Sequence, residues 1–290
     1  MLLEKVAYAR PDTVAGALQA LASSDGAAPL AGGQSLVNVL KHRVASLDLL
    51  VDISRLDELR GVSSGADGSL EIGACVTYDE LDHSEQVRSV QPLLADVAGH
   101  IEDQQIRDRG TIGGNCCLSD PTNNLPPLLV ALGATMVVQS AAGQRDVAAE
   151  DFFHGYFSTA VGEGELLRCV RIPPLSAGSG AGYSTIAVGA DSKAIARAAA
   201  VVRGNGTIDD ARVVLACVAP IPTRHAGMES ALRGASMSAE SARTAAHEIG
   251  AETQPFGDAH GSADYRREMA RVVAERAVMQ AIADGGGDRG

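Results

Sequence analysis

The first third of the chain alternates an amphipathic helix with short apolar strands. Residues 11–13 (Pro-Asp-Thr) are a typical helix start, and the apolar residues after them recur at helical spacing. These are Val14, Ala17, Leu18 and Leu21. Short apolar runs at 28–31 and 49–53 predict strands on either side of a glycine pair. We therefore expect a small α/β unit here.

From residue 62 the pattern becomes strand-rich. Asp67-Gly68 separates the short strands 62–64 and 70–74, which is a strong hairpin signal. Further strands are predicted at 134–139 and at 166–172, where Pro173-Pro174 ends the run. Helices are predicted at 77–81, 91–99 and 124–132.

The linker candidate is the Gly- and Ser-containing stretch 175–180. Beyond it, strands are predicted near 181–188, 196–203 and 208–218, and helices near 223–233, 238–250 and 263–283. One face of the last helix is predicted to hold Tyr265, Met269, Val272, Val273 and Ala277. The Gly-rich end, 285–290, is predicted to be disordered. This part of the chain resembles an α+β module with a sheet covered by helices.

Composition narrows the function. The 290 residues contain 24 Lys+Arg and 36 Asp+Glu, so the net charge of −12 disfavours nucleic-acid binding. No apolar run approaches the ~20 residues that cross a bilayer, and charges at Glu4 and Lys5 argue against a signal peptide. We expect a soluble, cytoplasmic chain. With five Tyr, four Phe and no Trp, its core must consist of Ala, Val, Leu and Ile.

The five cysteines show neither zinc-ligand spacing nor a disulfide framework. We interpret them as small buried hydrophobes, and the adjacent pair Cys116-Cys117 as structural thiols. The seven histidines form no recognisable catalytic pattern, so we interpret them as solvated or core side chains.

Two glycine loops carry most of the candidate chemistry. The first is 30–36 (Leu-Ala-Gly-Gly-Gln-Ser-Leu) and the second is 109–115 (Arg-Gly-Thr-Ile-Gly-Gly-Asn). Glycines allow positive φ and a close approach of the backbone to a ligand, and consecutive N–H groups form concave anion sites. Hydroxyl and amide side chains add donors, so the loops together could hold a pyrophosphate without Lys or Arg. Each loop alone is a weak signal, since neither fits a P-loop or a dinucleotide fingerprint.

The two loops and their surroundings resemble the FAD-binding medium subunit of molybdenum hydroxylases, the family of carbon monoxide dehydrogenase and xanthine dehydrogenase. The resemblance rests on 31–36, 50–53 and 105–115, and continues through 125–129, 164–173 and 222–234. It implies an α+β chain: a vanillyl-alcohol-oxidase-type FAD-binding fold of two α/β subdomains, then a flavoprotein C-terminal α+β domain. The implied domains are 1–55, 56–176 and 177–284.

The resemblance also implies the FAD site. Its residues would be Ala31, Gly32, Gly33, Gln34, Ser35, Leu36, Thr111, Ile112, Gly113, Gly114, Asn115, Asn124, Leu167 and Tyr183. The two loops would grip the pyrophosphate and reach toward the isoalloxazine, Leu167 would make a backbone contact to the flavin, and Tyr183 matches an aromatic of the family. No residue is expected to be catalytic or to bind a metal.

This sequence departs from the family pattern at several positions. Asn124 stands where Asp is usual, so it can accept a ribose hydrogen bond but lacks the charge. Ser184 and Thr185 stand where a Lys often follows the aromatic, and Lys193 is the candidate substitute from nearby. Gln34 replaces the His to which related flavoproteins tether FAD, so FAD should be non-covalent.

The implied function is an electron relay within a larger enzyme. Molybdopterin would lie on a large partner subunit and two [2Fe-2S] clusters on a small one. The resemblance implies a dimer of heterotrimers, that is, a heterohexamer. FAD in this chain would take electrons from the clusters and pass them to an external acceptor. Two alternatives remain: a self-sufficient flavin oxidase and an apo assembly subunit. For Arg107 and Arg109 two interpretations are open. They belong to a solvated helix end, or they face a partner subunit or the flavin phosphates.

Overall fold

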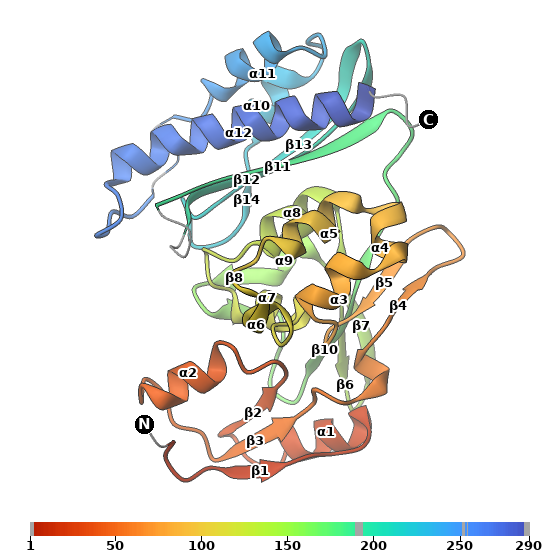
Figure 1. The fold of residues 1–290 in the computed structure, drawn as a ribbon, viewed down its shortest axis with the longest axis vertical. Coiled ribbons are helices and arrows are strands. Elements are labelled where there is room, and N and C mark those ends of the chain that lie inside the picture. The colour runs from red at the N-terminus through yellow and green to blue at the C-terminus, as the bar shows by residue number, and fades with distance from the viewer. Residues whose placement is uncertain (1–2, 189–193, 251–252, 254, 287–290) are drawn as a thin grey trace. The chain divides into compact units, whose positions relative to one another are not determined.

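A computed structural model describes residues 3–188, 194–250, 253 and 255–286 of the chain (Figure 1). The chain divides into two units. Unit 1 comprises residues 1–118 and 135–172, and unit 2 comprises 119–134 and 173–290. Both implied FAD subdomains thus contribute to unit 1, but the segment 119–134 clusters with the C-terminal part of the chain. The domain boundaries inferred from the sequence stay predictions.

Unit 1 begins with a three-stranded parallel sheet in the order β1-β3-β2 (Figure 1). Its strands are β1 (Ala7–Ala9), β2 (Ala27–Leu30) and β3 (Leu49–Asp52), and its helices are α1 (Val14–Leu21) and α2 (Leu36–Lys41). The Thr13 side chain caps α1 by accepting a hydrogen bond from Gly16 N. The predicted helix is confirmed, and its apolar face, Val14, Ala17, Leu18 and Leu21, is buried.

The rest of unit 1 is built on a five-stranded antiparallel sheet in the order β4-β5-β10-β6-β7. Its strands are β4 (Val62–Ser64), β5 (Leu70–Gly73), β6 (Thr135–Ser140), β7 (Gly143–Ala148) and β10 (Leu166–Ile172). The predicted hairpin at Asp67-Gly68 is confirmed as β4–β5. The partner of β6, strand β7, was not predicted; it is polar and largely exposed, so it lacks an apolar pattern.

This part of unit 1 also contains several short helices. They are the 3-10 helix η1 (Asp57–Leu59), α3 (Tyr78–His83), α4 (Glu85–Val90), α5 (Pro92–Gly99), α6 (Gln104–Arg107), α7 (Ile112–Leu118) and α9 (Ala149–Phe152). A small hairpin, β8 (Phe153–Gly155) and β9 (Ser158–Thr159), follows α9. The helices predicted at 77–81 and 91–99 are confirmed as α3 and α5. Helix α7 was not predicted; its first residues belong to the segment 109–115, where the sequence indicates a glycine loop.

Unit 2 contains an antiparallel sheet in the order β11-β12-β13-β14. Its elements are α8 (Leu125–Leu132), β11 (Ser179–Ala187), β12 (Ala194–Asn205), β13 (Thr207–Ala216), β14 (Thr223–Arg224), α10 (Ala226–Leu232), α11 (Ala239–Ala246) and α12 (Ala263–Gly286). Helices α10, α11 and α12 cover one face of the sheet, and α8 contacts β12 and β13 (Figure 1).

The core beneath α10–α12 has no aromatic side chain among its buried residues, and Ala is its commonest residue. Small residues let α12 lie unusually close to β11. A Cβ on Gly180 would stand 2.2 Å from Ala281 O, and one on Gly182 would stand 2.0 Å from Ala277 O. The core is therefore packed by the close approach of the α12 and β11 backbones and not by large side chains. This agrees with the aliphatic core, poor in aromatic residues, that the sequence predicts.

The predicted buried face of α12 is confirmed in part. Val273 and Ala277 are buried and Met269 packs against the core, whereas Tyr265 is 43% exposed and its neighbour Arg266 is buried. Much of the buried face of α12 consists of alanines. Alanine is less hydrophobic than valine or methionine, so the apolar pattern of the sequence points toward the Val and Met positions instead. The helix also includes Gly285 and Gly286, which we predicted to belong to a disordered tail; 287–290 lie outside the described residues. Within the described ranges, no helix is long and apolar enough to cross a membrane.

Candidate functional site

The first glycine loop joins β2 to α2. Gly33 has φ +74°, a left-handed conformation that favours glycine, and its carbonyl accepts from Val37 N to begin α2. The Ser35 side chain does not cap this helix, and the residue is exposed. Within the part of the chain that the structure describes, four consecutive backbone N–H groups of the loop donate no hydrogen bond: those of Gly33, Gln34, Ser35 and Leu36.

The second glycine loop differs because its end is helical. The N–H groups of Ile112 and Gly113 donate to main-chain carbonyls of the segment 74–76, at 3.0 and 2.9 Å. The Gly114 N–H donates to Thr111 Oγ1 at 3.0 Å. We expected positive φ and open donors in both loops, but among their glycines only Gly33 has positive φ. Because α7 begins at Ile112 and the N–H groups of residues 112–114 already have acceptors, the second loop presents a compact surface to a ligand and few free donors.

The two loops interlock through Gly32. A Cβ on this residue would stand 1.8 Å from Arg109 O and 3.1 Å from Gly110 Cα, so any side chain would separate the loops. Gly113 is equally confined, because its Cβ would stand 2.6 Å from the Ala74 Cβ. Gly114 is the exception: it is exposed, and its Cβ would meet only Thr111 Oγ1, at 2.9 Å. Gly114 therefore leaves an open face on α7 next to the interlocked loops.

Tyr78 packs against the second loop, a role that was not predicted from the sequence. Its ring lies 2.4 Å from the Cβ position of Gly110, and its hydroxyl accepts from Asn115 Nδ2 at 2.9 Å. Burial raises the pKa of the Tyr78 phenol, so it stays neutral. Thr77 and Glu80 fix this residue with a capping box at the start of α3. One amide donor that we assigned to a ligand, that of Asn115, thus serves the internal framework.

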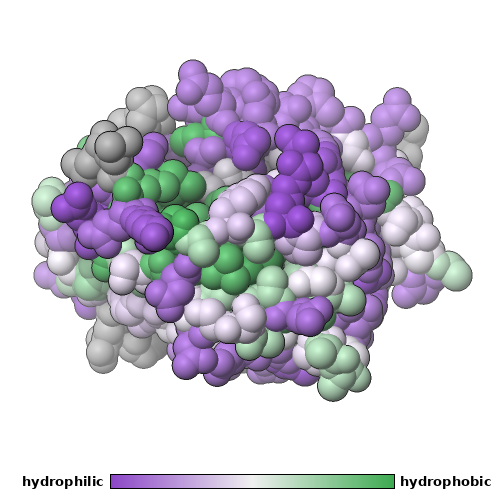
Figure 2. Space-filling view, turned by 90° about the horizontal axis from the view of Figure 1, so that it is seen from below, coloured by the Kyte–Doolittle hydropathy of each residue, from purple (hydrophilic) through white to green (hydrophobic). Residues whose placement is uncertain are grey.

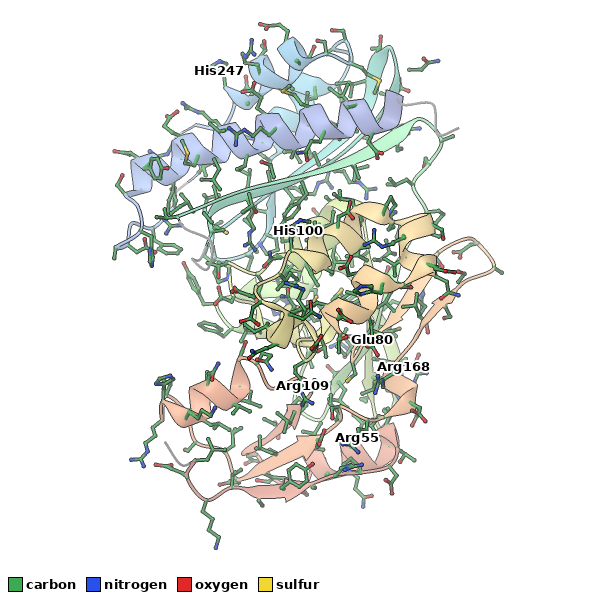
Figure 3. All side chains as sticks on the ribbon, viewed as in Figure 1. Arg55, Glu80, His100, Arg109, Arg168 and His247 are labelled. Atoms are coloured by element: carbon green, nitrogen blue, oxygen red, sulfur yellow. The ribbon has the colours of Figure 1, made fainter. Side chains whose placement is uncertain are left out.

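The two arginines before the second loop have different environments. Arg107 donates to Ile101 O, Glu102 O and Gln104 Oε1, so its guanidinium closes the turn ahead of α6. Arg109, labelled in Figure 3, is exposed, and its side chain forms no hydrogen bond or ion pair within the described residues. Of the two, only Arg109 is available to an anion or a partner.

Leu167 lies on β10 at an irregularity of the sheet. The register between β10 and β6 shifts between Leu167 and Cys169, and Arg168 O accepts from Ala74 N instead. Such a bulge turns backbone groups away from the ladder. A backbone contact of Leu167 to a ligand is compatible with this geometry, since its side chain is buried in the sheet.

The remaining candidates belong to unit 2. Tyr183, on β11, donates from its hydroxyl to Asn124 O at 2.9 Å, and Asn124 stands directly before α8. Burial raises the pKa of the Tyr183 phenol, although the charge of Arg197 opposes the rise. Ser184 points to the buried side, Thr185 is exposed, and Lys193 lies outside the described residues.

All five cysteines are free. Four of them are buried, as predicted. Cys117, on α7, is exposed, so the prediction that all five are buried is wrong for this residue. Burial raises the pKa of the neighbouring Cys116 well above its usual range and keeps this thiol neutral. Across the described residues, no group of three or more His, Cys, Asp or Glu side chains could hold a metal ion.

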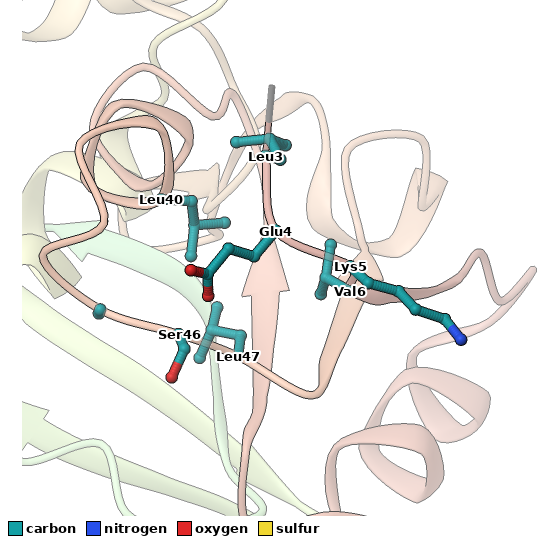
Figure 4. A pocket seen from close by; sticks show the side chains of 8 residues that line it. Leu3, Glu4, Lys5, Val6, Leu40, Ser46 and Leu47 are labelled. Atoms are coloured by element: carbon teal, nitrogen blue, oxygen red, sulfur yellow. The ribbon is translucent and has the colours of Figure 1, made fainter. Parts of the chain in front are cut away.

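A pocket of ≈ 40 Å³ lies beside the first sheet, lined by Leu3, Glu4, Lys5, Val6, Leu40, Ala45, Ser46 and Leu47 (Figure 4). It has room for little more than one water molecule, and contains none of the candidate FAD residues. The face seen in Figure 2 carries a group of hydrophobic residues among hydrophilic ones. Leu3, which lines the pocket, and Val44, next to the lining residue Ala45, are exposed apolar residues.

The arrangement in unit 1 fits the pyrophosphate of a dinucleotide cofactor. The first loop offers open N–H donors and the Ser35 hydroxyl, and the second adds the open face at Gly114. Donors from main chain and hydroxyls can hold phosphate oxygens without a cation. Together with the sheet arrangement, these loops describe an α+β chain suited to a dinucleotide cofactor.

Comparisons with known proteins identify its family. The model "FAD binding domain in molybdopterin dehydrogenase" matches residues 4–175, and "CO dehydrogenase flavoprotein C-terminal domain" matches 183–281. The carbon monoxide dehydrogenase medium chain of Hydrogenophaga pseudoflava is 36% identical over 285 residues, covering 98% of this chain and 99% of the relative. The glyceraldehyde dehydrogenase medium chain of Sulfolobus acidocaldarius is 35% identical over 274 residues, covering 94% and 97%.

Solved structures agree. Carbon monoxide dehydrogenase from Hydrogenophaga pseudoflava matches with TM-score 0.94 at 35% identity, covering 98% of this chain and 99% of the other. Quinoline 2-oxidoreductase from Pseudomonas putida 86 matches with TM-score 0.93 at 31% identity, covering 98% and 99%. The chain therefore belongs to the FAD-binding medium subunits of the molybdenum hydroxylases, with FAD as its cofactor. The family predicted from the sequence and the α+β fold are confirmed.

The interlock at Gly32 generates a stability prediction. Gly32→Ala should destabilise the protein by about 1–3 kcal/mol, because the new Cβ collides with a main-chain carbonyl that cannot rotate away. The control is Gly155→Ala, where no heavy atom lies within 4 Å of the Cβ position. Since the chain has no Trp, urea unfolding is followed by circular dichroism. Equal midpoints for both variants would show that the loops do not meet as described.

Proposed function

We propose that this chain is the FAD-containing electron-transfer subunit of a molybdenum hydroxylase. It accepts electrons from [2Fe-2S] clusters of a small partner subunit and passes them to an external acceptor, while a large partner subunit carries molybdopterin. The observation that carries this proposal is the pair of interlocked glycine loops, on a chain that spans 97–99% of relatives named as medium chains. A medium chain implies a larger and a smaller companion, and we extend this to a dimer of heterotrimers.

The proposed site divides its tasks between the loops. The open N–H groups and hydroxyl of the first loop bind phosphate oxygens, and Gln34, in place of a tethering His, leaves FAD non-covalent. The second loop holds the first in place and presents Gly114 to the cofactor. FAD, when bound, supplies the ability to receive electrons singly and release them in pairs.

The full set of proposed contacts keeps the residues predicted from the sequence. They are Ala31, Gly32, Gly33, Gln34, Ser35, Leu36, Thr111, Ile112, Gly113, Gly114, Asn115, Asn124, Leu167 and Tyr183. Three of them act mainly on the framework: Gly32 and Gly113 through close packing, and Asn115 through Tyr78.

The open face at Gly114 makes the site testable. Gly114→Val should weaken FAD binding at least tenfold, about 1.4 kcal/mol, because the branched side chain occupies the space proposed for the cofactor. The loss of stability should be smaller than in Gly32→Ala, since among the described residues the new Cβ meets within 4 Å only a side-chain hydroxyl, that of Thr111 at 2.9 Å. Gly155→Val is the control, because its Cβ position is open and distant from both loops in sequence. FAD titration of the two apo-proteins gives the comparison, and equal affinities would contradict this placement.

The relay is tested on the native complex. Chains that co-purify with this protein are identified by mass spectrometry, and flavin absorbance is followed under anaerobic conditions with carbon monoxide and glyceraldehyde, named in its relatives, as first candidates. We expect a substrate that bleaches the flavin in the complex to leave it oxidised in the isolated chain. Bleaching in the isolated chain would indicate a self-sufficient oxidase. A chain that stays colourless with excess FAD would indicate an assembly subunit.

A further inference from the structure

Arg109 combines a fixed backbone with a side chain that no described residue binds. Its N–H donates to Ile106 O at 3.2 Å, and its carbonyl lies against Gly32, where a Cβ would stand 1.8 Å away. The side chain is exposed and forms no hydrogen bond or ion pair within the described ranges. The neighbouring carboxylate, that of Asp108, accepts instead from Gln104 Nε2 at 2.7 Å. The five N–H donors of the guanidinium thus start from a fixed main chain and are available to a ligand.

The acidic side chains of unit 1 are all described. The residues of this unit outside the described ranges are 1 and 2, a methionine and a leucine, so they bring no carboxylate side chain to Arg109. Among the remaining residues of unit 1, all of them described, no carboxylate pairs with this arginine. Within its own unit, Arg109 therefore carries an uncompensated positive charge.

The open donors of the first glycine loop begin directly after the contact with Arg109. Gly32, which touches Arg109 O, is followed by the four residues 33–36, whose N–H groups donate no hydrogen bond in the part of the chain that the structure describes. Figure 3 shows Arg109 beside this loop, between the parallel sheet and the short helices of unit 1. The guanidinium and the open donors therefore belong to one unit and to neighbouring positions within it.

These two kinds of donor differ in charge. Main-chain N–H groups carry only partial charges, so they position phosphate oxygens without neutralising them. A guanidinium is permanently charged, and its planar fork matches two oxygens of one phosphate. Each phosphate of a pyrophosphate diester is negative, and the net charge of −12 on this chain opposes the approach of any anion. A cation beside the open donors offsets this repulsion at the point where the phosphates would bind.

We propose that Arg109 is the cationic phosphate-binding residue of the FAD site and sets its preference for phosphorylated flavins. This inference rests on the proposed function, in which the first loop binds the pyrophosphate. The N–H groups of residues 33–36 position the phosphate oxygens, and the Arg109 guanidinium donates charge-assisted hydrogen bonds to them. Loss of this charge therefore weakens the binding of FAD and leaves the binding of riboflavin, which has no phosphate, unchanged.

The test is a titration of the apo-protein with FAD and with riboflavin, followed by flavin fluorescence. Arg109→Gln keeps a neutral donor and removes the charge. We expect its affinity for FAD to fall about tenfold, the size of a lost hydrogen bond to a charged group, and its affinity for riboflavin to stay at the wild-type value. Arg109→Lys keeps the charge but not the planar fork, and should recover part of the loss. Added NaCl should weaken FAD binding more in the wild type than in Arg109→Gln.

The matched control is Lys5→Gln, which removes the same charge from another exposed residue of unit 1. Lys5 precedes β1, whereas the first loop follows β2. Because β1, β3 and β2 are parallel, the control residue and the loop lie at opposite edges of the sheet. Lys5→Gln should therefore bind FAD as tightly as the wild type, so that a general effect of net charge is separated from a local one.

The outcomes separate this inference from the proposed function. If Arg109→Gln does not fold, the wild type decides, because added NaCl should weaken its binding of FAD and not that of riboflavin. An Arg109→Gln variant with wild-type affinity for FAD would overturn the inference alone, and loss of co-purifying chains from that variant would assign Arg109 to a partner subunit. Failure of the wild type to bind FAD would contradict the proposed function, and this inference with it.

Discussion

The candidate site depends on the close contact of two backbones at Gly32. The Cα of this residue faces Arg109 O so closely that even a methyl group is excluded. This contact fixes a loop from the parallel sheet against a loop from the antiparallel part of unit 1. The open N–H donors of residues 33–36 acquire a defined position only because the second loop stands behind them. Donors fixed before the ligand arrives lose less conformational freedom on binding.

The second loop is held rigid because its own hydrogen-bonding groups bind partners inside the protein. Its N–H groups bind the 74–76 main chain and the Thr111 hydroxyl, and its Asn115 amide binds the buried Tyr78. The two loops, so similar in sequence, therefore differ in chemistry: one presents donors and the other presents shape. This division supports the proposal that an acidic chain binds a pyrophosphate mainly through main-chain and hydroxyl donors, with Arg109 as the one cationic side chain of the two loops.

The sequence predicted elements whose signals are local. The apolar stripe of α1 and the Asp67-Gly68 hairpin need only a few neighbouring residues, and both are present. Helix α7 was missed because its paired glycines are poor helix formers, and the tight packing of Gly113 against Ala74 overrides that preference. Tyr78 was missed because Asn115, its partner, lies 37 residues away.

The central claim is that the two loops hold FAD by its pyrophosphate. Titration of the apo-protein with FAD and with riboflavin, which shares the isoalloxazine but has no phosphate, tests it most directly. The account predicts that riboflavin binds at least a hundredfold more weakly than FAD, about 2.8 kcal/mol. Equal affinity for the two flavins would contradict it, because the open donors of the first loop would then contribute nothing to cofactor binding.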